Sequence, residues 1–152
     1  MTDPGAEKVW AFCEAHGLPV IVHAGEDIGF EPPFHSEPSD FAEVQRRHPA
    51  LTLIAAHLGG WRNWDKVERD LVGTTVYIDT AFVTPYMPYE QFRRIIVAHG
   101  VDHVLYGTDS PWQDLRDGMS QIQKLGLSPA ETETVFYGNA KRLWSKWFPQ
   151  DE

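Results

Sequence analysis

The feature that most constrains the fold is a repeated alternation between helix-like segments and short apolar runs. Each run is rich in Val, Ile, Leu or Ala and is continuous, which is typical of strands covered on both faces. Strands that alternate with helices predict parallel βα units, and therefore an α/β fold with one parallel sheet of about four strands. The predicted strands are residues 18–25, 51–57, 75–81 and 103–109.

The segments between the apolar runs carry helix signals. Asp3 can cap the first helix, Pro4 suits its first position, and Gly17 can end it. Ser128 and Glu131 have the spacing of a capping box, which predicts another helix start. No linker-like or low-complexity segment interrupts the pattern, so we expect a single domain over residues 1–152. The predicted helices are residues 3–17, 39–49, 63–73, 88–100, 128–139 and 140–148.

Composition narrows the class of partner. The chain has 152 residues, of which 42% are hydrophobic, enough for one real core. A net charge of −9 argues against a broad nucleic-acid or anionic-membrane surface, and leaves a small molecule as the expected partner. No apolar run approaches a membrane span, and the amino-terminal residues lack the pattern of a signal peptide. Cys13 is the only cysteine, so a reducing cytoplasm is the expected location.

The loops of the predicted sheet are unequal in length. Connections that enter the strands are brief, whereas those that leave them are long, as in residues 24–38 and 110–118. Long loops at the carboxyl ends of parallel strands are where α/β proteins build their sites. We therefore expect a site at this end, where four polar side chains close the strands: His23, His57, Asp79 and Asp109.

Two imidazoles and a carboxylate at this end suit a divalent metal ion. His23 and His57 each interrupt an apolar run at its end, and Asp109 follows another strand. Neutral histidine nitrogen and aspartate oxygen are ordinary ligands of zinc, the expected metal, and of manganese, the alternative. Each of these residues, taken alone, could also have a purely structural role, as a polar group at a strand end that bonds to the backbone. For Asp79 that interpretation, a side-chain cap, is as good as a functional one.

Other candidates lie around these residues. His35 lies in the long loop and could reach a ligand, while Trp61, Arg62 and Trp112 flank the site residues and could line a substrate pocket. Glu26 and Asp27 are interpreted as ordinary loop carboxylates. Three further histidines end predicted helices at the opposite end of the sheet, where they suit the helix dipole rather than catalysis: His16, His48 and His99.

With these residues in place, the chain resembles the amidohydrolase-related superfamily of metal-dependent hydrolases, which have a TIM-barrel fold. The stretches that carry the resemblance are "GLPVIVHAGEDIG", "LIAAHLGGW", "VYIDTAF", "VLYGTDSPW" and "FYGNAKRLW". They are similar to the fifth to eighth strands and the terminal helix of that family. The resemblance implies a half-barrel, the carboxyl half of a (β/α)8 barrel.

The resemblance also implies roles for three residues. His23 would be a metal ligand, and His57 would bind a second metal or position and deprotonate the attacking water. Asp109 would touch the metal and shuttle the proton, so that His57 and Asp109 are the catalytic candidates. The implied activity is hydrolysis of C–O or C–N bonds in a small molecule. The decarboxylase branch shares the same ligand set and is the alternative within the superfamily.

The chain departs from the family pattern in two respects. The family's first strand carries a His-x-His pair, and this sequence contains none. The family's fourth strand often carries a lysine or carboxylate, and we expect this sequence to begin after that strand. A full barrel needs eight strands and about 250 residues. We therefore expect the enzyme to be incomplete without an amino-terminal half or a second copy in a homodimer. The alternatives are a non-catalytic remnant and a ligand-binding α/β module in which the three polar residues are structural.

Overall fold

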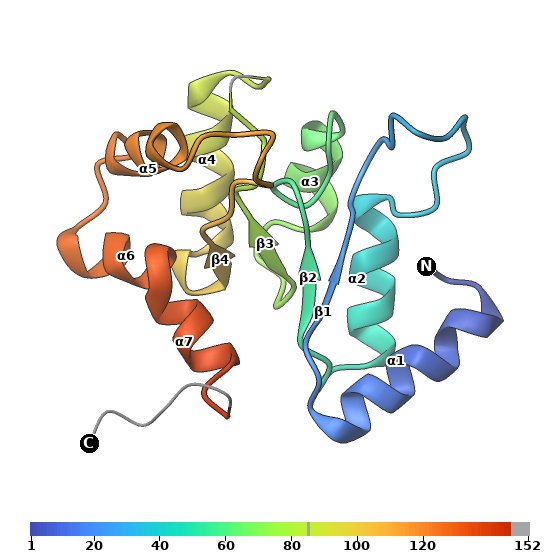
Figure 1. Ribbon diagram of the computed structural model, residues 1–152. Helices are drawn as coiled ribbons and strands as arrows, with labels where there is room; N and C mark the ends of the chain where they lie inside the picture. The colour runs from blue at the N-terminus through green and yellow to red at the C-terminus, as the bar shows by residue number, and fades with distance from the viewer. Residues whose placement is uncertain (85, 147–152) are drawn as a thin grey trace.

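A computed structural model describes residues 1–84 and 86–146. Its centre is one four-stranded parallel sheet in the order β1-β2-β3-β4, as the alternation predicts (Figure 1). The strands pair in sequence, with Ile21 opposite Ile54 and Ile78 opposite Val104. Every connection between strands contains a helix, so the fold is α/β and corresponds to part of a TIM barrel. The strands are β1 (Val20–Val22), β2 (Leu53–Ala55), β3 (Tyr77–Asp79) and β4 (Val104–Leu105).

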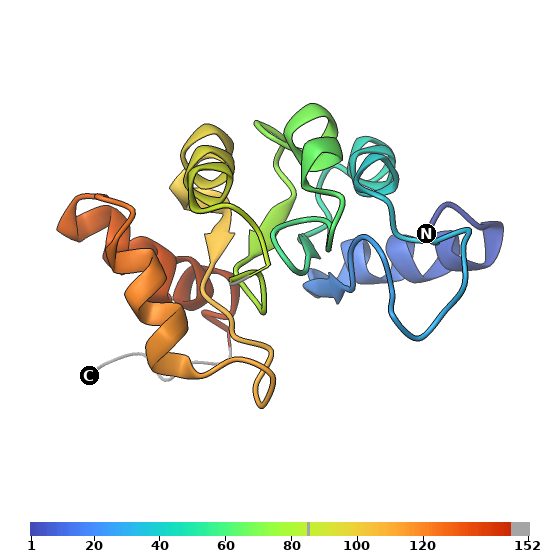
Figure 2. The same ribbon diagram turned by 90° about the horizontal axis from the view of Figure 1, so that it is seen from above.

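The helices are distributed unevenly around the curved sheet. Seen from above, α2 (Pro38–Arg47), α3 (Trp64–Asp70) and α4 (Tyr89–His99) stand side by side along one face of the sheet (Figure 2). α1 (Pro4–His16) lies at the β1 end. The remaining helical segments lie at the β4 end: η1 (Val101–His103), α5 (Leu115–Gln123), α6 (Pro129–Glu133), the π-helical turn η2 (Thr134–Gly138) and α7 (Asn139–Leu143).

The predicted caps are confirmed. The side chain of Asp3 accepts the Gly5 N–H at 2.7 Å, and Gly17 ends α1 with a left-handed φ of 60°. The Ser128 hydroxyl accepts the Glu131 N–H, and the Glu131 carboxylate accepts the Ser128 N–H, which completes the capping box. Local side-chain chemistry therefore sets where these helices begin and end.

α5 was not predicted, because Gly118 lies in its middle and glycine usually weakens a helix. The structure gives the reason for this glycine. A Cβ at position 118 would lie 2.9 Å from the Tyr106 hydroxyl, which donates to the Leu115 carbonyl at 2.6 Å. The helix keeps its start because the Asp114 side chain accepts the Arg116 N–H. The tight contact with Tyr106, the residue after β4, therefore overrides helix propensity.

Two other boundaries differ from the prediction. The strands are shorter than the apolar runs. β1, β2 and β4 end before His23, His57 and Asp109, whereas Asp79 is the last residue of β3. The last helix, expected over residues 140–148, ends at Leu143, and residues 147–148 lie outside the described part of the chain. Among the described residues, no helix has the length and apolar character needed to cross a membrane.

The core lies between the sheet and the helices α2–α4. Its largest fully buried side chains include Phe41 and Phe92. The opposite, inner face of the sheet was expected to stand open, and this holds only at β1. Ile21 is 62% exposed, whereas Ile54 and Leu105 are 1% and 6% exposed. The inner face is therefore covered at Ile54 of β2 and Leu105 of β4 and exposed at Ile21 of β1.

Candidate active site

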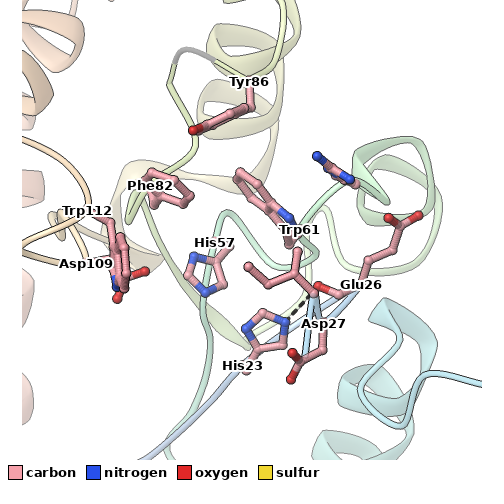
Figure 3. A pocket seen from close by; sticks show the side chains of 11 residues that line it. His23, Glu26, Asp27, His57, Trp61, Phe82, Tyr86, Asp109 and Trp112 are labelled. Carbon is pink, nitrogen blue, oxygen red and sulfur yellow. Dashed lines mark hydrogen bonds between the residues drawn. The ribbon is translucent and has the colours of Figure 1, made fainter. Parts of the chain in front are cut away.

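The carboxyl ends of the strands surround a cavity of about 470 Å³. Figure 3 shows His23 and His57 next to each other on one side of it, with Asp109 across from them. The predicted meeting of these three residues at one mouth is therefore present. The lining residues are His23, Glu26, Asp27, Ile28, His57, Trp61, Arg62, Phe82, Tyr86, Asp109 and Trp112.

Backbone strain gathers at this mouth. Non-glycine residues rarely adopt positive φ, and those that do are often held so by a functional site. In the described chain five non-glycine residues have φ between 54° and 58°, and all lie in segments that follow a strand: His57, Leu58, Arg62, Phe82 and Asp109. Four of these five line the cavity.

Two loops are joined by backbone bonds behind the cavity. Trp61 N–H donates to the Ala24 carbonyl at 2.6 Å, and Glu26 N–H donates to the Trp61 carbonyl at 2.9 Å. Gly25 lies at this crossing, where a Cβ would lie only 2.2 Å from the Trp61 nitrogen. The glycine therefore permits the approach that holds Trp61 against the mouth.

The orientation of His57 is fixed by two bonds. Its backbone N–H donates to the Asp79 carboxylate at 2.8 Å, and its ring Nδ1 contacts the Ala81 carbonyl at 2.9 Å. A carbonyl only accepts, so Nδ1 carries a proton, and in the neutral ring the lone pair is on Nε2. This is the state in which imidazole binds a metal ion or accepts a proton.

His23 has the mirrored arrangement. Its Nε2 donates to the Glu26 carbonyl at 2.9 Å, which leaves Nδ1 as the nitrogen with the lone pair. The ring centres of His23 and His57 are 4.9 Å apart. A backbone carbonyl that fixes the tautomer of a histidine is a common outer partner in metal sites. Both imidazoles therefore have the chemistry of metal ligands.

The Asp79 side chain connects the segments that follow β2 and β3. Its carboxylate is buried and accepts the N–H groups of His57 and Ala81 at 2.8 and 3.0 Å. Burial raises the pKa of Asp79, and these backbone bonds oppose that shift. The structure thus gives Asp79 the side-chain cap that was one of its two predicted roles.

Asp109 is exposed on the other wall of the cavity. Within residues 1–84 and 86–146, no three histidine, cysteine, aspartate or glutamate side chains lie close enough together to hold a metal ion. The donor types suit a divalent ion, but the described residues do not complete a site with the usual three protein ligands. The assignment of His23, His57 and Asp109 as metal ligands stays a prediction.

An aromatic wall faces the two histidines. Trp61 stacks on Phe82 with ring centres 5.2 Å apart and planes 17° apart, and Tyr86 meets Trp61 edge-on at 4.9 Å. The Arg62 guanidinium lies 5.8 Å from the Trp61 ring centre. Such a wall suits a flat ligand, and Arg62 suits one that carries negative charge.

A family comparison decides what kind of protein carries this site. A family model described as "Amidohydrolase" matches residues 2–146. The chain belongs to the amidohydrolase family. The match confirms the resemblance drawn from the strand-end histidines. A comparison with curated proteins finds no significant match.

Several solved structures are similar to this chain over most of its length. An uncharacterized TIM-barrel protein from Bordetella bronchiseptica is 25% identical, with a TM-score of 0.71 over 95% of this chain and 51% of its own. A dihydroxybenzoic acid decarboxylase from Polaromonas with bound manganese is 16% identical, with a TM-score of 0.64 over 97% and 55%. Amidohydrolase 2 from Bifidobacterium longum subsp. infantis is 19% identical, with a TM-score of 0.62 over 94% and 56%. The chain thus spans about half the length of these proteins.

The residues that the sequence predicts to bind substrate differ in whether they line the cavity. Trp61, Arg62 and Trp112 line it, as predicted. His35 does not. It is exposed in the loop between β1 and α2, where its carbonyl accepts the amino terminus at 2.8 Å. Other residues of this loop, Glu26, Asp27 and Ile28, line the cavity, but His35 is not among the lining residues.

Sequence reasoning missed several lining residues. Glu26 and Asp27 were interpreted as ordinary loop carboxylates, and Ile28, Phe82 and Tyr86 were not singled out, yet all five line the cavity. Phe82 and Tyr86 belong to the segment after β3, which is also a carboxyl-end loop. The expectation that loops at the carboxyl ends of parallel strands carry the site would also have selected this segment.

The histidines assigned to the opposite end are at helix ends, as predicted. His16 and His99 are the last residues of α1 and α4, and His48 caps the end of α2. None of the three lines the cavity. His48 instead contacts the carboxylates of Glu7 and Glu14 at 2.9 and 3.0 Å, which ties α2 to α1.

Proposed function

We propose that the chain is the carboxyl half of a metal-dependent hydrolase that cleaves a C–O or C–N bond of a small molecule. The observation that carries this proposal is the pair of imidazoles at the strand ends. A backbone carbonyl accepts from one ring nitrogen of His23 and another from one of His57, so that each neutral imidazole would have its other nitrogen available beside the same cavity. Membership of the amidohydrolase family supports an enzyme, and the manganese-bound relative supports a divalent ion. Zinc is the first candidate and manganese the second.

Each group of residues around the cavity would have a separate role in this reaction. His23 and His57 would hold the ion, which supplies the Lewis acidity that activates water and polarises the bond to be cleaved. Asp109 would accept a proton from the attacking water and return it to the leaving group. Trp61 and Phe82 would stack on a flat substrate, while Arg62 would bind a negatively charged group on it.

A decarboxylase is the second candidate, because one of the similar structures is a dihydroxybenzoic acid decarboxylase. The same cavity would then hold an aromatic acid whose carboxylate leaves as carbon dioxide. The two candidate reactions can be distinguished by their products. A hydrolase releases an acid with an alcohol or amine, whereas the decarboxylase releases carbon dioxide.

Calorimetric zinc titration tests the metal assignment. We expect weak binding by the wild type, because ligands are missing, and tighter binding as the pH rises through the histidine range. His23→Ala should abolish this binding. His35→Ala is the matched control, since His35 is an exposed histidine in the same loop that does not line the cavity.

Identical isotherms for the wild type and His23→Ala would show that His23 does not bind the metal and would contradict a metal site here. That result would favour the remaining alternatives, a non-catalytic remnant or a ligand-binding module with hydrogen-bonded histidines.

A further inference from the structure

The cavity between the strand ends adjoins a second hollow. This hollow has a volume of about 270 Å³ and lies between the segment after β3 and the start of α5. Phe82, Tyr86 and Trp112 line both spaces (Figure 3). Tyr86 and Trp112 are 49% and 70% exposed, and large exposed apolar side chains beside a cavity mark a binding surface. A ligand in the cavity therefore has room to extend past these rings into the hollow.

α5 supplies polar side chains to the hollow. Asp117 and Gln121 line it and are four residues apart, so they lie on one face of this helix. In the described part of the chain, no hydrogen bond or ion pair engages either side chain. Asp114, which caps α5, also lines the hollow, and only its Oδ1 accepts the Arg116 and Asp117 N–H groups. Acceptor oxygens are therefore available to a ligand here.

Gln113 joins the two segments that enclose the hollow. Its Oε1 accepts the Phe82 N–H at 3.0 Å, and its Nε2 donates to the Thr84 hydroxyl at 2.7 Å. The segment after β3 is thus bonded to the segment after β4, which keeps the aromatic rings opposite α5. The Gln113 amide is occupied by these bonds, so the groups left for a ligand are those of Asp114, Asp117 and Gln121.

The charges of the two spaces differ. Arg62 lines the main cavity and not the hollow. Among the described residues that line the hollow, the charged ones are Asp114 and Asp117, both acidic. Carboxylates bind an ammonium group through charge-assisted hydrogen bonds, and aromatic rings bind it through cation–π contact. The combination of both around one hollow favours a cation.

We propose that the hollow is a subsite for a protonated amine, at the end of the substrate that does not react. The reacting end would lie in the main cavity beside His23 and His57, with its negatively charged group near Arg62. That placement rests on the proposed function, whereas the binding of an ammonium group by the hollow does not. The substrate class is then a flat molecule with an amine at its far end.

Binding of phenethylamine to the full chain, followed by NMR without any metal ion, tests the subsite. The probe has a flat ring for the aromatic side chains and an ammonium group for α5. Phenylethanol is the neutral comparison, since it keeps the ring and replaces the ammonium group by a hydroxyl. We expect the amine to bind at least about fivefold more tightly than the alcohol. It should also shift the Trp112 indole and Gln121 side-chain amide signals.

Variants of α5 test which carboxylate binds the amine. Asp117→Asn should weaken amine binding about fivefold and leave alcohol binding unchanged. Gln121→Glu adds a carboxylate on the same face, so it should tighten amine binding about twofold. Asp102→Asn is the matched control, because Asp102 is an exposed aspartate at the opposite end of β4, and it should change neither affinity.

Three results would overturn the proposal. They are equal affinities for the amine and the alcohol, amine binding that neither α5 variant changes, and signal shifts confined to His23 and His57. The measurement involves neither metal nor catalysis. A failed zinc titration would therefore contradict the proposed function and leave the amine subsite standing, and the reverse also holds.

Discussion

At the residue scale, the mouth depends on a few positions where only one kind of residue fits. Three successive residues after β2 have positive φ, from His57 through Leu58 to Gly59. This turn places the His57 ring beside the cavity and lets its backbone reach Asp79. The sequence "HLGGW" is thus explained by geometry: the histidine faces the cavity, the glycines relieve crowding, and Trp61 closes against the neighbouring loop.

Gly25→Ala tests this packing. Gly25 has φ of 95°, and an added Cβ would lie 2.2 Å from the Trp61 nitrogen and 2.3 Å from its oxygen. Backbone atoms held by their own hydrogen bonds cannot move aside cheaply. We expect the free energy of unfolding to fall by about 2 kcal/mol or more, measured by urea denaturation.

Gly73→Ala is the control for this substitution. Gly73 has φ of 82° and no atom within 4 Å of an added Cβ, so it carries the backbone strain without the clash. It should cost only about 1 kcal/mol. Equal losses in the two variants would contradict the role given to the contact between Gly25 and Trp61.

At the scale of elements, α1 is held against α2 by a histidine between two carboxylates. The Glu14 and Glu7 carboxylates raise the pKa of His48 above its usual 6.5, and His48 in turn lowers the pKa of Glu14. Arg47 adds an ion pair to Glu7. The contact therefore requires a protonated histidine and ionised glutamates.

The signs of these shifts define a pH window. A raised histidine pKa gives stability that is fully present below pH 6.5 and is lost as the pH rises through the native pKa. A lowered glutamate pKa gives stability that is present above pH 4.5 and is lost as the pH falls through the native pKa. We expect the melting temperature of the wild type to exceed that of His48→Gln most between these limits.

Comparing the two proteins removes the effect of His99. Burial lowers the pKa of His99, so its contribution has the opposite sign and weakens below pH 6.5, but it is the same in both proteins. A difference in melting temperature that stays constant from pH 5 to pH 9 would show that the His48 contact carries no charge.

The sequence predicted the order of elements because its signals are local. The caps at Asp3 and Gly17 and the apolar runs act within a few residues of themselves. α5 escaped prediction because Gly118 is required by Tyr106, a contact between distant segments. His23 and His57 could be placed at one mouth because parallel strands end together. Their free ring nitrogens could not, since these depend on bonds to the Glu26 and Ala81 carbonyls.

At the scale of the whole molecule, the chain has the fold of part of a barrel. Its cavity opens at the carboxyl ends of all four strands, which is where a complete barrel has its active site. Under the proposed function, the two imidazoles, the aromatic wall and Asp109 are this chain's contribution to such a site.

In the completed enzyme, Asp109→Asn should lower kcat by on the order of 100-fold, the range of general acid–base catalysis. The amide keeps the size of the side chain but cannot carry the proton. Asp102→Asn is the control, since Asp102 is exposed at the opposite end of β4. A near wild-type rate for Asp109→Asn would show that Asp109 does not transfer the proton.

The most direct test of the central claim, that the strand-end histidines form half of a metal site, is manganese titration followed by NMR of the histidine rings. The chain has seven histidines, so the others serve as internal controls. Paramagnetic manganese broadens the signals of the rings that bind it. We predict that the His23 and His57 signals broaden at substoichiometric manganese while those of His16 and His35 stay sharp. Equal broadening of all seven, or broadening that spares His23 and His57, would contradict the account.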